Sequence, residues 1–219
     1  MGSRRDPHML SVVTPPARRA RLVATMELVF ESTRIVTQPE FAAWVDERAR
    51  SGDIAHYELL QGRVVMTPPA GYPHGEIESR IHVQLANFVA ARQLGKVFGS
   101  SQGFELPTGD TVEPDVSFVS TERWNAALPP ERGKFLRVVP DLVVEVLSTS
   151  TASHDRGEKK ATYGAAGVRE YWLLDGRARE VIAYVLENGR YGQERAFTAG
   201  AARSLVLAGL VVDVAGLFP

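Results

Sequence analysis

The sequence predicts an α/β fold in which a mixed β-sheet is flanked by helices. Apolar residues at helical spacing mark a long helix over 73–94, and β-branched runs such as 142–147 have the composition of buried strands. After residue 170, Asp-Gly and Asn-Gly turn pairs separate three further strand patterns. With 219 residues, 44% of them hydrophobic, the chain is long enough for one sizeable core and too short for two typical domains.

The predicted elements begin with a short helix and a hairpin. Thr37 and Glu40 have capping-box spacing, with a proline in the first turn, so we expect a helix that runs to about Arg50. Strands at 57–60 and 63–67 flank a Gln-Gly turn, and a proline pair ends the second strand. The long helix over 73–94 follows this hairpin.

The remaining elements alternate between strands and short helices. We expect strands at 96–100, at 102–106, around Asp115, around Glu145, and at 170–174, 180–186 and 191–198, with a short helix near Glu122 and a helix that ends at Gly167. Together these elements make a mixed sheet with helices beside it.

Two of the expected strands carry an acid among apolar neighbours. Asp115 lies in the segment EPDVSFV and Glu145 in PDLVVEVLS, and an unpaired buried carboxylate costs roughly several kcal/mol, so we expect a cation beside both. Neighbouring strands run about 4.8 Å apart, which lets two acids from adjacent strands hold one Mg²⁺ at about 2.0–2.1 Å. Asp141 shares the strand of Glu145 but stands about 13 Å away, too far to bind the same ion.

A lysine on the next helix completes a hydrolytic set. If that helix begins at Asp155, capped by its side chain with Glu158 three residues on, then Asp155, Lys159 and Tyr163 share one face. An ammonium beside two metal-bound carboxylates stays protonated and can stabilise a pentacovalent phosphate or orient a water molecule. The residues alone leave open that these acids lie at a surface or edge and that the lysine is solvated.

The same segments resemble a nuclease family. The run PDLVVEVLSTSTASHDRGEKKATYGAAGVREYWLLD, with EPDVSFV and YELLQGRVVMTPPAGYPHGEI upstream, is similar to the Uma2 (Uma-two) family of restriction endonucleases, within the PD-(D/E)XK nuclease superfamily, over about residues 37–218. The resemblance implies a restriction-endonuclease-like core and divalent-metal-dependent cleavage of DNA, with Mg²⁺ (or Mn²⁺) as cofactor. It assigns Asp115 and Glu145 as metal ligands and Lys159 as the catalytic lysine.

One position departs from the superfamily pattern. The usual lysine, two residues after the glutamate, is Leu147 here, so the role passes to Lys159, with the adjacent Lys160 as the weaker alternative. The resemblance also favours Glu58 as an accessory carboxylate, in competition with two glutamates of the long helix, Glu76 and Glu78. Three further residues are expected near the metal, the scissile phosphate or the substrate backbone: His74, Arg156 and Lys160.

Charge and composition restrict the partners. Residues 1–25 hold five arginines and one aspartate, a net charge of +4, and the whole chain is −1, so the rest carries −5. We expect residues 1–25 to form a disordered basic tail and residues 26–219 to form a single nuclease domain. An acidic domain makes few phosphate contacts, which predicts a short DNA footprint or one shared by a homodimer. No apolar run reaches the ~18 residues of a membrane span, so no membrane partner is expected, and the absence of cysteine fits a cytoplasmic protein.

A second class of function stays open. The acidic charge of the domain also fits a catalytically inactive restriction-endonuclease-like binding or assembly module. The intact set of two acids and a lysine favours the endonuclease, because such costly buried charges are the first to be lost when activity is not needed.

Overall fold

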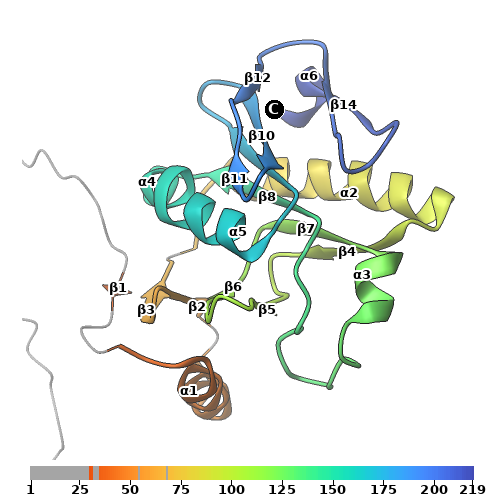
Figure 1. Cartoon of the computed structure of the whole chain (residues 1–219). Coiled ribbons are helices and arrows are strands. Elements are labelled where there is room, and N and C mark those ends of the chain that lie inside the picture. Colours follow the sequence, from red (N-terminus) through yellow and green to blue (C-terminus); the bar gives the residue numbers. More distant parts are fainter. Residues whose placement is uncertain (1–29, 32–34, 54, 68) are drawn as a thin grey trace, which may run out of the picture.

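The computed structural model describes residues 30–31, 35–53, 55–67 and 69–219, which form two principal β-sheets with helices around them (Figure 1). The predicted basic tail, residues 1–25, lies outside the described residues. Within the described part of the chain, no helix is both long and apolar enough to cross a bilayer.

The larger sheet carries the segments that hold the predicted acids. Its strands run in the order β11-β10-β9-β8-β7-β4, with β12 also paired to β10. Their bounds are β4 (Gly95–Gly99), β7 (Val116–Ser120), β8 (Leu142–Leu147), β9 (Glu170–Asp175), β10 (Glu180–Glu187), β11 (Arg190–Tyr191) and β12 (Arg195–Phe197). Strands β8 and β9 are parallel and the other pairs are antiparallel, which confirms the predicted mixed sheet.

The smaller sheet has the order β1-β3-β2-β6-β5, and a separate antiparallel pair lies near the C-terminus. Its strands are β1 (Phe30–Glu31), β2 (Tyr57–Leu60), β3 (Arg63–Met66), β5 (Phe104–Glu105) and β6 (Thr111–Val112), and the separate pair is β13 (Ala201–Arg203) with β14 (Val211–Asp213). The hairpin of β2 and β3 is the one that the sequence predicts.

Helices cover both faces of the larger sheet (Figure 1). The helices are α1 (Gln38–Arg50), α2 (His74–Arg92), α3 (Thr121–Ala126), α4 (Ala152–His154), the π-helical turn η1 (Asp155–Lys159), α5 (Lys160–Ala166) and α6 (Val214–Leu217). Of these, α1 packs against the smaller sheet and not against the larger one. Thr37 and Glu40 form the predicted capping box at the start of α1, and Gly167 ends α5 in the left-handed conformation, as predicted.

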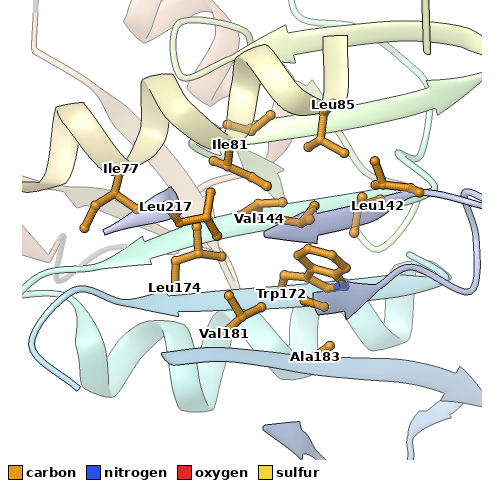
Figure 2. Packing of buried hydrophobic residues seen from close by; sticks show 14 of the residues in the cluster. Ile77, Ile81, Leu85, Leu142, Val144, Trp172, Leu174, Val181, Ala183 and Leu217 are labelled. Atoms are coloured by element: carbon orange, nitrogen blue, oxygen red, sulfur yellow. The ribbon is translucent and has the colours of Figure 1, made fainter. Parts of the chain in front are cut away.

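The first hydrophobic cluster lies between α2 and the sheet. Ile77, Ile81 and Leu85 of α2 point toward Val144 and Trp172 of the sheet (Figure 2). The C-terminal segment, including α6, packs into the same cluster and covers the rest of this face. The start of α2 is thereby fixed beside the ends of β7 and β8.

The residues of β8 alternate between the two faces of the sheet. Val144 and Val146 face α2, while Val143 belongs to the second cluster, which includes Tyr163 of α5. Glu145 accepts a hydrogen bond from the same Tyr163, so its carboxylate lies on the α5 side. The strand therefore has a fully apolar face and a face that carries one acid.

Three expectations about the elements are wrong in detail. The predicted helix start at Asp155 is wrong, because the helical turn begins at Ala152, whose N–H donates to the carbonyl of Ser148, and Asp155 has helical dihedral angles inside the run. The single strand predicted over 191–198 is divided into β11 and β12, and at the break the N–H of Gly192 donates to Val185. The strand predicted over 102–106 is only two residues long, at β5, and the C-terminal elements β13, β14 and α6 were not predicted.

Candidate active site

A cavity of about 750 Å³ lies where the two sheets, the start of α2 and the α4–η1 helical run meet. It is lined by seven carboxylates, three histidines and one lysine: Asp53, Glu58, Glu78, Glu113, Asp115, Glu145, Asp155, His56, His74, His154 and Lys159. The acids outnumber the permanently charged basic groups of this lining, so the cavity attracts cations.

The two predicted acids come from neighbouring strands. Val116 of β7 pairs with Val144 of β8, which puts Asp115 and Glu145 one residue beyond this pair on the two strands. The Oδ2 atom of Asp115 accepts a hydrogen bond from the N–H of Val146 at 2.7 Å. Glu145 is 4% exposed, and its Oε1 accepts from the hydroxyl of Tyr163 at 2.7 Å. The structure thus brings these acids together, as the strand arithmetic predicts.

Lys159 lies buried among three carboxylates. Its Nζ is 2.8 Å from Glu145 Oε1, 3.1 Å from Glu58 Oε1 and 3.9 Å from Asp155 Oδ1. The residue is 7% exposed, so these contacts replace nearly all of its hydration. The predicted lysine and one of the two predicted acids therefore form a direct ion pair.

A π-helical turn presents this lysine. Asp155 and Lys159 bound η1 and are both buried, whereas Arg156 and Glu158 between them face outward to other partners. Tyr171 fixes the start of the turn by donating its hydroxyl hydrogen to the carbonyl of Asp155 at 2.9 Å. Insertions of this kind are common at functional sites, because they change which side chains of a helix share one face.

The electrostatics of the lysine and its partners are those of a crowded anionic pocket. Burial disfavours the ammonium, but the charges of Glu145, Glu58 and Asp155 raise the pKa of Lys159 well above its usual value. Burial is the main cause that raises the pKa of Glu145 well above its usual value, and the nearby carboxylate of Asp115 adds to it while Lys159 opposes it. Burial likewise raises the pKa of Asp155 to about 6. One lysine does not offset this number of acids, and an added cation would relieve their repulsion.

The N-terminal part of α2 adds a histidine and a further acid to the site. His74 Nε2 lies 3.3 Å from Asp115 Oδ2, and one ligand atom from each of His74, Glu78 and Asp115 lies within 4.8 Å of the others. Two ligands bound to one cation at about 2.1 Å stand roughly 3.0–3.5 Å apart, so the separation of His74 and Asp115 fits a shared ion. The donor set therefore suits a divalent cation.

The two residues expected to contact the substrate backbone lie elsewhere. Arg156 makes an ion pair with Asp175 at 3.2 Å, and the ammonium of Lys160 lies 3.5 Å from the centre of the Tyr184 ring. Neither residue lines the cavity. The structure does not bring them to the acids and the lysine.

The structure places Glu58, which the resemblance favours as an accessory carboxylate, beside Lys159, and its supporting contacts were not expected from the sequence. Glu58 Oε1 also accepts from the N–H of Glu113 at 2.8 Å, and the Glu113 carboxylate lies 2.6 Å from His56 Nδ1. The signal for Glu113 was its position two residues before Asp115 in the same acidic segment. His56 carries no signal in the sequence beyond preceding the strand of Glu58.

The comparisons with known proteins agree on a nuclease family and fold. A family model described as "Uma2: Putative restriction endonuclease" matches residues 39–215. Among solved structures, the chain is similar to the crystal structure of "a putative nuclease belonging to DUF820" from Anabaena variabilis ATCC 29413, with a TM-score of 0.62 and 18% sequence identity over 74% of this chain and 89% of that chain. At this identity the similarity is one of fold. Among curated proteins, none matches the sequence.

Proposed function

Because the chain belongs to the Uma2 family of restriction-endonuclease-like proteins, we propose that it is a metal-dependent endonuclease that hydrolyses phosphodiester bonds in DNA. The observation that carries the proposal is the buried contact of Lys159 with Glu145 at 2.8 Å, in an acidic cavity that also holds Asp115. A buried lysine among several acids is costly to maintain for stability alone.

Each of the three residues has a defined part in this reaction. Asp115 and Glu145 would hold the cation, and both are oriented by fixed donors, the N–H of Val146 and the hydroxyl of Tyr163. The Tyr163 contact engages Oε1 of Glu145 and leaves Oε2 for the cation. When bound, Mg²⁺ or Mn²⁺ supplies Lewis-acid polarisation of the phosphoryl group and lowers the pKa of bound water.

Lys159 contributes a permanent positive charge. Surrounding acids raise its pKa well above the usual value, after burial has partly lowered it, so Nζ keeps its proton throughout the neutral range. A protonated Nζ can donate to a non-bridging phosphate oxygen, whose negative charge grows as water attacks, and can orient that water. Glu58 also contacts this ammonium, at 3.1 Å, and helps to hold Nζ in place.

Cleavage of supercoiled plasmid tests the proposal. The full chain is incubated with Mg²⁺ or Mn²⁺ beside two variants, Glu145→Ala and Lys159→Ala, and a control, Glu76→Ala, whose carboxylate pairs with Arg80. We expect nicking by the wild type and the control, and loss of on the order of 10²-fold or more in both site variants. Nicking that persists unchanged in both would contradict this active site, and no nicking in any sample would favour an inactive binding module.

A further inference from the structure

The start of α2 and the residue that directly precedes β7 bring together a histidine and two carboxylates. His74 and Glu78 are four residues apart, so their side chains share one face of α2, and Asp115 meets them from the sheet. One ligand atom of each lies within 4.8 Å of the others, and all three residues line the cavity. Among the described residues, these three form the group of histidines and acids whose ligand atoms all lie within that distance of one another.

Glu145 stands outside this group, although it neighbours Asp115. Its Oε1 accepts from Tyr163 and contacts Lys159 at 2.8 Å, and Glu145 is not among the residues whose ligand atoms lie within 4.8 Å of one another. The carboxylate of Asp115 is therefore common to two groups, one with Glu145 and the other with His74 and Glu78. The second group contains a nitrogen donor and, within the described part of the chain, makes no ion pair with a lysine.

The nitrogen donor changes which cation the site prefers. Mg²⁺ and Ca²⁺ take oxygen ligands almost exclusively, and Mg²⁺ prefers carboxylates and water. First-row transition cations accept imidazole as readily as carboxylate, and their affinities rise from Mn²⁺ along the series. A mixed set of one imidazole and two carboxylates accordingly selects a transition cation over the two hard cations.

We propose that His74, Glu78 and Asp115 bind a divalent first-row transition cation in preference to Mg²⁺ and Ca²⁺, and that His74 sets this preference. This inference deepens the proposed nuclease function, and a role of the bound cation in catalysis rests on that function. Mn²⁺, the first and weakest-binding cation of that series, is the one tested, and its binding is measurable without any DNA.

The test measures cation binding by the full metal-free chain at pH 7.5. Mn²⁺ is titrated and followed by the electron paramagnetic resonance signal of the free ion, and Mg²⁺ and Ca²⁺ are titrated calorimetrically and as competitors of Mn²⁺. We expect Mn²⁺ to bind on the order of tenfold more tightly than Mg²⁺ in the wild type. The His74→Ala variant should lose on the order of tenfold or more in Mn²⁺ affinity while its Mg²⁺ affinity changes less than about threefold.

Two matched controls separate ligation from general charge. Glu78→Gln should weaken Mn²⁺ and Mg²⁺ together, whereas Glu76→Gln, on the same helix but paired with Arg80, should leave both unchanged. His154→Ala removes another histidine of the cavity, one that contacts Glu158 at 3.1 Å, and should also change neither affinity. Circular dichroism of each variant checks that α2 remains folded.

Equal affinities of the wild type for Mn²⁺ and Mg²⁺ would overturn the proposal, as would a His74→Ala variant that keeps the wild-type preference. A preference that also disappears in His154→Ala would overturn the assignment to His74. Failure of the nuclease proposal looks different, because Mn²⁺ would then bind with the expected preference while plasmid remained uncut.

Discussion

Replacing Lys159 with methionine gives the sharpest test of the electrostatics in this site. Methionine keeps most of the length and the apolar stem of lysine but removes the charge that contacts Glu145 and Glu58 at 2.8 and 3.1 Å. Breaking a buried ion pair by removing one partner costs about 3–5 kcal/mol, because the other charge is left uncompensated. We expect that loss in the free energy of unfolding at pH 8 in metal-free protein.

The loss in the free energy of unfolding should depend on pH, in a direction fixed by the pKa values of Glu145 and Asp155. Burial raises the pKa of Glu145 well above its usual value and that of Asp155 to about 6, and removal of the ammonium would raise both further. An acid whose pKa is raised in the folded state binds protons more strongly there than in the unfolded chain, so stability falls as the pH rises from about 4 through the folded pKa. At pH 5 the acids are largely protonated in the variant, and we expect a deficit of only about 1–2 kcal/mol.

Urea unfolding followed by tryptophan fluorescence and circular dichroism measures both values. For a chain of this length the pH 8 deficit corresponds to about 6–20 °C in melting temperature, at about 2–4 °C per kcal/mol. Lys160→Met is the matched control, because its ammonium lies over the Tyr184 ring and makes a cation–π contact of about 0.5–1 kcal/mol at an exposed site. A Lys159→Met deficit that equals the control, or that is the same at pH 5 and pH 8, would refute the reasoning.

Three further predictions concern the cation and the C-terminal segment. Burial lowers the pKa of His74 and the contact with Asp115 raises it, and the net result is a pKa above the usual value. Because protons then compete with the cation for this imidazole, the Mn²⁺ affinity measured by calorimetry should increase steadily between pH 6 and pH 8. A flat profile would exclude His74 as a ligand. Mn²⁺ at 100 times its dissociation constant should raise the free energy of unfolding of the wild type by about 2.7 kcal/mol, and Glu78→Gln should reduce that rise at the same Mn²⁺ concentration. Glu170→Gln should lower the free energy of unfolding in urea by about 1–3 kcal/mol without changing Mn²⁺ binding, because this fully buried carboxylate accepts hydrogen bonds from Ser204 and from backbone N–H groups of the segment that follows. Unchanged stability would show that apolar packing holds this segment.

Much of the fold could be predicted because its signals are local. A capping box at Thr37 and Glu40 defines the start of α1, and a left-handed glycine at Gly167 defines the end of α5. The placement of Asp115 and Glu145 could also be predicted, since an acid inside an apolar strand requires a compensating partner and strand spacing limits where that partner lies.

Other features depend on contacts between distant parts of the chain. Glu78 reaches Asp115 only because α2 packs on the sheet with its first turn beside β7, and no helix pattern contains that register. The C-terminal strands carry weak local patterns, and their position depends on Glu170, which binds the segment after Ser204. The π-helical turn around Lys159 likewise follows from tertiary contacts such as the Tyr171 hydroxyl on the Asp155 carbonyl.

The position of the lysine bears on the electrostatics of the proposed hydrolysis. In the usual superfamily pattern the lysine stands two residues after the glutamate, which puts it on the same face of the strand. Leu147 occupies that position here and packs into the second hydrophobic cluster, yet Lys159 reaches the carboxylate of Glu145 at 2.8 Å from the neighbouring helical turn. In the proposed reaction an ammonium lies beside the acids, and either element can supply it, because electrostatic stabilisation depends on where the charge is and not on the sequence spacing that delivers it. Asp155 and Lys159 bound the π-helical turn η1, are both buried and line the cavity together.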